Sequence, residues 1–197
     1  MMKGPGMRSS RFGKSAEEEQ SVVLDAELKI VVFGLHWTAP DEKGTAQGEG
    51  AADLDAWCLL LDEKDRVLEA IHPARPESTD GSVVHTGDSR TGARAWDDER
   101  VFVFLEPLPG HVATVAFAAV SANGRPFGTV PGAACHVRDA STEMEILRVD
   151  LTALGSQTEH GAAAIRRSHS GWTLSTAVPE LDGFELRPLA PRPAAGE

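Results

Sequence analysis

Apolar and polar residues alternate along much of the chain, in short runs separated by turn-forming residues. In the stretch 53–61 every second residue from Leu54 to Leu60 is apolar, so these side chains share one face of an extended strand. A polar turn at 62–65 follows, and 66–71 is expected to return as the antiparallel partner. This pair is the clearest hairpin that the pattern predicts.

The same criteria predict strands elsewhere. Alternation or β-branched residues occur at 22–37, 100–105, 114–121, 127–137, 144–151, 164–167 and 171–178. The turn at 122–124 is expected to close a further hairpin, and a short helix fits within 151–164. About eight to ten strands at this spacing are typical of an antiparallel β-sandwich. The predicted fold class is therefore all-β, with long acidic loops and at most one or two short helices.

The length of 197 residues fits one domain between two tails. Residues 1–20 lack periodicity and are expected to be a disordered N-terminal tail, and 188–197, rich in proline and alanine, a disordered C-terminal tail. The sandwich domain is expected over 21–187.

Net charge, apolar runs and cysteine count limit the classes of function and the cellular location that we expect. A net charge of −11 repels nucleic-acid phosphates and favours cations or basic partners. No apolar run is long enough for a transmembrane segment and no secretory signal is visible, so a cytoplasmic location is expected. The basic residues near the N-terminus leave peripheral contact with an anionic membrane open. The cysteines, Cys58 and Cys135, are expected to be free core thiols.

Carboxylates and hydroxyls gather in the loop 84–92, which is closed by the acidic run 97–99. Asp53 and Asp55 lie two apart in a strand, so both can reach one hard cation from the same face. Twelve acidic residues stand against five basic ones between positions 53 and 99. A bound cation would relieve this repulsion, although the local pattern taken alone favours a merely solvated acidic loop.

Several segments together resemble the signature of the tellurium-resistance TerD family. They are Asp53-Leu54-Asp55-Ala56, the strand end 59–62, the stretch 80–92, Asp97-Asp98-Glu99, Phe127-Gly128 and the segment 167–172. The resemblance extends over about residues 21–187. It implies a calcium-binding β-sandwich of bacterial stress-response systems, with no catalytic activity and with other stress-response or TerD-like proteins as partners.

The resemblance also implies a set of calcium-site residues: Asp53, Asp55, Asp88, Ser89, Thr91, Gly92, Asp97, Asp98 and Glu99. The chain departs from the family pattern at Ser89, where asparagine is usual, and at 93–96, where the family alternates acidic residues with glycines. Arg94 adds a positive charge that lowers cation affinity. We therefore expect a weakened calcium site, with loss of the metal as the alternative.

The expected function is a non-catalytic calcium-binding module in resistance to tellurite and other toxic agents. The first alternative is a metal-independent interaction module of a stress-response complex. A hydrolase is the second, since His85 and Asp88 could form a dyad, but the sequence has no nucleophile elbow, phosphate loop or zinc-spaced histidine pair. Trp57 and Trp172 are expected to be packing residues.

Overall fold

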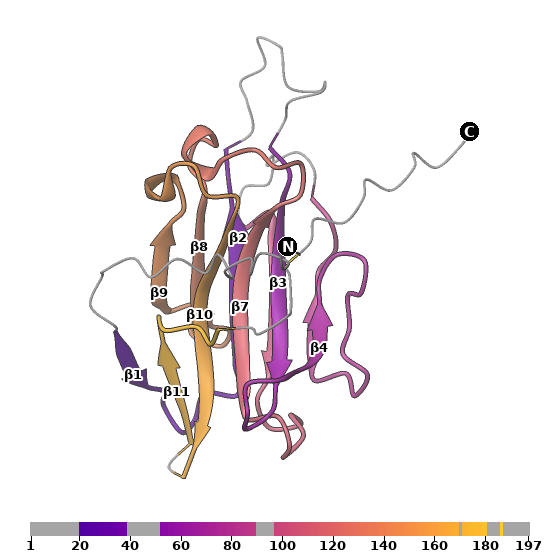
Figure 1. Ribbon diagram of the computed structural model, residues 1–197. Coiled ribbons are helices and arrows are strands. Elements are labelled where there is room, and N and C mark those ends of the chain that lie inside the picture. Colours follow the sequence, from indigo (N-terminus) through magenta and orange to yellow (C-terminus); the bar gives the residue numbers. More distant parts are fainter. Residues whose placement is uncertain (1–19, 39–51, 90–96, 170, 181–185, 187–197) are drawn as a thin grey trace, which may run out of the picture.

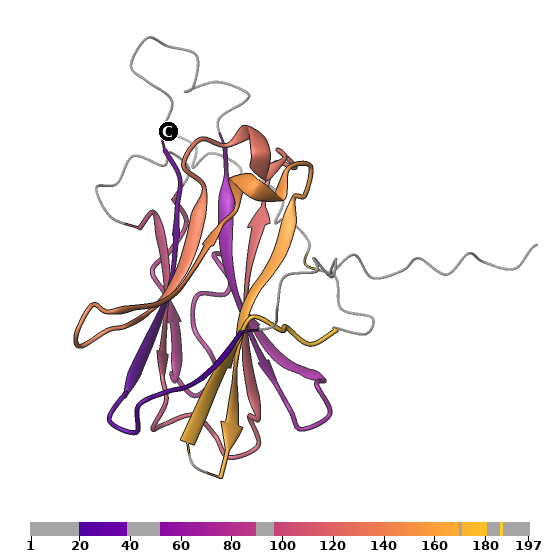
Figure 2. The same ribbon diagram turned by 90° about the vertical axis from the view of Figure 1, so that its left-hand side faces the viewer.

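Strands of the described chain form two antiparallel sheets that pack face to face (Figures 1 and 2). The computed structural model describes residues 20–38, 52–89, 97–169, 171–180 and 186. The six-stranded sheet has the order β1-β11-β10-β7-β3-β4, and the five-stranded sheet has the order β5-β6-β2-β8-β9. The strands are β1 (Ser21–Val23), β2 (Ile30–His36), β3 (Leu54–Leu61), β4 (Val67–Ile71), β5 (Val83–His85), β6 (Glu99–Phe104), β7 (Thr114–Ser121), β8 (Ala134–Asp139), β9 (Glu145–Asp150), β10 (Glu159–Ser168) and β11 (Gly171–Ser175). The predicted all-β sandwich is confirmed.

The main core lies between the two sheets. Phe33 of β2 and Phe117 of β7 stack there, with ring centroids 5.0 Å apart, and so join one sheet to the other. Both cysteines are free and buried in this core, as the sequence predicts. Apolar residues facing inward from both layers supply the hydrophobic stabilisation expected of a sandwich.

A second apolar cluster lies on the other face of the six-stranded sheet. Strands β3 and β7 are buried along their whole lengths, so they have no solvent-facing side. Trp57 and Leu59 belong to this second cluster together with Leu186, which lies beyond the last strand. Residues after β11 therefore contribute to the packing of the sheet.

The prediction of one strand over 22–37 is wrong, because a turn divides it. The backbone N–H of Glu27 donates to the side chain of Asp25 (2.9 Å), and that of Leu28 donates to the Asp25 carbonyl (3.1 Å). Aspartate stabilises such turns by bonding nearby backbone groups. The chain crosses here from β1 in one sheet to β2 in the other.

The predicted hairpin at 122–124 is also wrong, and of the strand predicted over 127–137 only 134–137 is confirmed, as part of β8. A turn does follow β7, but the next strand, β8, lies in the other sheet. The crossing contains a short 3-10 helix, η1 (Phe127–Thr129), and ends at Pro131 and Gly132. Gly132 has a φ of 66°, which ordinary side chains avoid. The expected short helix within 151–164 is a single 3-10 turn, η2 (Thr152–Leu154).

The aspartates Asp53, Asp55 and Asp88 gather at the beginning of β3. β7 pairs with β3 along its length, from Leu54 to Leu61, whereas β4 pairs only from Cys58 onward. The first residue of β6, Glu99, and the segment that follows β5 both lie beside β3 ahead of Cys58. The sequence pattern did not predict β5 as a strand.

Candidate metal centre

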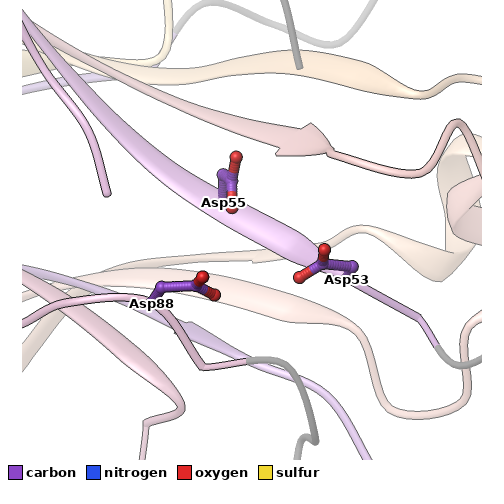
Figure 3. Close-up of side chains that lie close together, drawn as sticks. All are labelled: Asp53, Asp55 and Asp88. Atoms are coloured by element: carbon purple, nitrogen blue, oxygen red, sulfur yellow. The ribbon is translucent and has the colours of Figure 1, made fainter. Parts of the chain in front are cut away.

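Three carboxylates meet beside the beginning of β3 (Figure 3). Asp53 precedes the strand and Asp55 lies within it, while Asp88 comes from the segment after β5. One oxygen of each carboxylate lies within 4.8 Å of the others. No second group of three potential metal-ligand side chains occurs among the residues described.

The three carboxylates differ in their contact with solvent. Asp55 is only 4% exposed, Asp53 is half-buried and Asp88 is exposed. Solvent can therefore reach the group from the side of Asp88. A buried carboxylate beside two others is costly to ionise unless positive charge compensates it.

Glu99, the first residue of β6, connects the two segments that carry these aspartates. Its side chain is fully buried. The backbone N–H of Ala56 donates to Glu99 Oε2 (2.8 Å), and that of Ser89 donates to Glu99 Oε1 (3.0 Å). Ser89 itself is 5% exposed. A carboxylate that accepts backbone N–H groups makes stronger hydrogen bonds than a neutral acceptor does.

Each carboxylate of the acidic run 97–99 lies close to the imidazole ring of a histidine. Asp97 Oδ1 lies 3.2 Å from His136 Nε2, Asp98 Oδ2 lies 3.1 Å from His36 Nδ1, and Glu99 Oε2 lies 3.3 Å from His85 Nε2. These three carboxylates do not belong to the group formed by Asp53, Asp55 and Asp88. Each of them instead lies beside a histidine on a different strand of the five-stranded sheet, namely β8, β2 and β5.

Asp97 is held in its ionised form. Burial opposes ionisation, but the contact with His136 and the charges of Arg100 and Arg138 outweigh it, so the pKa of Asp97 lies below the usual 3.8. Arg100 Nε donates to Asp97 Oδ2 at 3.0 Å. Asp98 accepts the backbone N–H of Trp37 at 3.1 Å.

Comparison with known proteins identifies the chain. The model of the TerD domain family matches residues 15–189, which is most of the sequence. The chain belongs to the TerD family. The tellurium resistance protein TerZ of Serratia marcescens is 37% identical over 165 residues, covering 80% of this chain and 85% of the relative.

Other relatives of this TerD protein carry stress-response names. General stress protein 16U of Bacillus subtilis is 31% identical over 156 residues, covering 75% of this chain and 79% of that protein. Among solved structures, a homologue of the telluride resistance protein TerD from Streptomyces coelicolor A3(2) superimposes with a TM-score of 0.66 at 21% identity, over 82% of this chain and 93% of that one. That likeness supports the fold.

The sequence-predicted site residues of this TerD domain thus divide into three sets. Asp53, Asp55 and Asp88 come together, whereas Ser89, Asp97, Asp98 and Glu99 are held by hydrogen bonds or ion pairs around them. Thr91, Gly92 and the departing segment 93–96 lie outside the described residues.

Sequence reasoning did not foresee the histidine partners of the acidic run. The sequence predicts that His36 and His136 are surface or packing residues, and it singles out His85 only for a conceivable dyad with Asp88. The three histidines stand 49 or more positions apart from one another along the chain. Only the pairing of β2 with β6 and β8, and of β5 with β6, brings them beside residues 97–99. No local sequence signal predicts such contacts.

The helices of the described chain, η1 and η2, are far too short to span a bilayer.

Proposed function

We propose that this TerD domain is a non-catalytic calcium-binding module of a bacterial stress response, including resistance to tellurite. The observation that carries the proposal is the convergence of Asp53, Asp55 and Asp88. The names of the relatives support the stress-response part. We further propose that it acts in the cytoplasm with other stress-response proteins.

The donor set fits calcium by its chemistry. Calcium takes six to eight oxygen ligands, and carboxylates bind it through one oxygen or two. Asp53, Asp55 and Asp88 would hold the ion, with backbone carbonyls and water completing the shell. Three carboxylates present no nitrogen or sulfur ligand, which argues against zinc or copper.

We expect the affinity to be weak. The family pattern places further acidic residues at 93–96, where this chain has Ala93, Arg94, Ala95 and Trp96. Each missing carboxylate removes a ligand, and Arg94 adds a repelling charge. The accessible position of Asp88 lets the ion exchange with solvent.

The non-catalytic part of the proposal rests on the state of the strongest nucleophiles. Burial raises the pKa of the Cys135 thiol to about 12 and raises that of Cys58 as well, so neither forms a thiolate near neutral pH. His85, the residue of a conceivable hydrolase dyad, is buried with its Nε2 toward Glu99. Within the described part of the chain, the carboxylate group is therefore the candidate site that we favour.

Calorimetric titration with calcium tests the proposal. The unaltered protein should release or absorb heat with saturation below about 10 mM calcium, within the range of weak protein sites. Asp88→Asn should remove that signal. Asp150→Asn, which changes an exposed aspartate on β9, is the matched control and should leave it intact. No heat from the unaltered protein would reject calcium binding and favour the metal-independent interaction module.

A further inference from the structure

Two backbone bonds to one carboxylate define how the metal centre is assembled. Glu99 Oε2 accepts the N–H of Ala56 and Glu99 Oε1 accepts the N–H of Ser89, at 2.8 and 3.0 Å. Ala56 directly follows Asp55, and Ser89 directly follows Asp88. Each oxygen of Glu99 therefore fixes the residue next to one of the clustered aspartates.

Glu99 accepts the N–H of Ala56 at a position where no carbonyl of β4 is available. β4 pairs with β3 only from Cys58 onward, so the N–H of Ala56 has no partner from that strand. A buried backbone N–H without an acceptor is costly, and the side chain of Glu99 satisfies it. Glu99 thus bonds β3 through one carboxylate oxygen and the segment that carries Asp88 through the other.

His85, the last residue of β5, lies beside Glu99 without a hydrogen bond from its Nε2. The N–H of Gly87 donates to His85 Nδ1 at 2.9 Å, so Nδ1 carries no proton. In neutral His85 the proton therefore sits on Nε2, 3.3 Å from Glu99 Oε2. Gly87 has a φ of 100°, a conformation that favours glycine and turns the chain toward Asp88.

We propose that Glu99 is the positioning residue of the metal centre and not one of its ligands. Its carboxylate joins β3 to the segment 86–89 through these two bonds, so that Asp55 and Asp88 lie close together before a cation arrives. This inference rests on the proposed calcium site. Like charges oppose the gathering of aspartates, and the charge-assisted bonds of Glu99 offset that opposition.

Preorganisation is the functional consequence. A site whose segments are already joined avoids the ordering cost that binding would otherwise include. Residues that orient ligands without touching the metal commonly change affinity by about ten- to a hundredfold. Loss of Glu99 should therefore weaken calcium binding in that range without removing a ligand.

The first test needs no metal. Amide hydrogen exchange, followed by NMR in a chelator, should show Ala56 and Ser89 protected in the unaltered protein. Glu99→Gln leaves one acceptor oxygen for two N–H donors, so exchange at one of these amides should accelerate about tenfold or more. Glu145→Gln, at an exposed position of β9, is the control and should not change either amide. Unchanged protection of both amides in Glu99→Gln overturns the proposal.

The second test counts ligands with europium(III), a hard oxygen-seeking ion that emits light. Its luminescence lifetimes in H₂O and D₂O give the number of coordinated waters. Asp88→Asn should add coordinated water relative to the unaltered protein, whereas Glu99→Gln should leave the number unchanged while the affinity falls about tenfold or more. An added water in Glu99→Gln makes Glu99 a ligand and overturns the proposal.

A third variant covers the case in which Glu99→Gln does not fold. Glu99→Asp keeps the charge but is one methylene shorter, so it cannot reach both amides. A cooperative melt monitored by circular dichroism establishes that the variant is folded. Faster exchange at Ala56 or Ser89 in it supports the inference, and full protection of both overturns it. Failure of europium and calcium to bind the unaltered protein would reject the calcium site, while the exchange result would still decide the role of Glu99.

Discussion

The imidazole of His72 stacks on the indole of Trp57, with ring centroids 4.4 Å apart and an interplanar angle of 21°. Trp57 is 4% exposed and belongs to the outer apolar cluster, while His72 is half-buried. Burial lowers the pKa of His72 below 6.5, and the charges of His85 and Arg75 lower it further. The stack therefore contains a neutral imidazole at pH 7.

This lowered pKa makes stability depend on pH in a defined direction. Below about pH 6.5 the unfolded chain takes up a proton at His72 before the folded protein does, so the free energy of unfolding should fall as the pH decreases. His72→Phe keeps an aromatic ring and removes the titration. Urea unfolding between pH 7 and 5 should show a smaller loss of stability in His72→Phe than in the unaltered protein. An equal loss in both would show that His72 does not titrate differently on folding.

Gly34 of β2 should not tolerate a side chain. A Cβ at this position would lie 2.3 Å from His136 Nε2 and 2.7 Å from Asp97 Cγ, and His136 is buried. Gly34→Ala should therefore disrupt the contact between His136 and Asp97 and cost about 1 to 3 kcal/mol in the free energy of unfolding.

The control for Gly34 is Gly110→Ala. Gly110 is exposed and a Cβ there meets nothing within 4 Å, so the change should stay within about 0.5 kcal/mol. Chemical denaturation of both variants measures the difference. Equal stabilities would mean that His136 moves aside without cost.

Both thiols should resist modification in the folded protein. Cys58 and Cys135 are buried, and burial raises the pKa of each. A disulfide-exchange reagent should therefore label neither at pH 8 until the protein unfolds, and both at once in denaturant. Rapid labelling of one thiol under native conditions would reveal local opening of β3 or β8.

Calcium should raise the melting temperature through the metal centre. A ligand at 100 times its dissociation constant stabilises the folded state by about 2.7 kcal/mol, roughly 5 to 10 °C for a chain of this size. Asp53→Asn should abolish the shift between chelator and calcium, because it removes a carboxylate of the cluster. Thermal melts monitored by circular dichroism measure it, with Asp150→Asn as the control. A full shift in Asp53→Asn would place the ion elsewhere.

Local pattern was sufficient to predict much of the sheet structure. The alternation over 53–61 and the run at 114–121 correspond to β3 and β7, which pair along their lengths. Burial of alternate residues against a core leaves this periodic signature in the sequence. The closeness of Asp53, just before β3, to Asp55 within it follows from the same two-residue period of an extended chain.

The order of strands in space could not be predicted in this way. The Asp25 turn sends the chain from one sheet to the other, and Phe127 lies in a 3-10 turn that the apolar pattern cannot distinguish from a strand. The role of Glu99 depends on residues 43 and 10 positions away in sequence. Such contacts are set by tertiary packing, which single-sequence periodicity does not encode.

The packing of Leu186 against the outer face of the six-stranded sheet has a practical consequence. A protein shortened to Ser175 would retain every strand, yet it would uncover apolar side chains around Trp57 on a face that is otherwise closed. Exposed apolar surface of this kind promotes self-association. Proteins trimmed at the last strand should therefore be soluble only at low concentration, and affinity tags are better joined after Leu186 than before it.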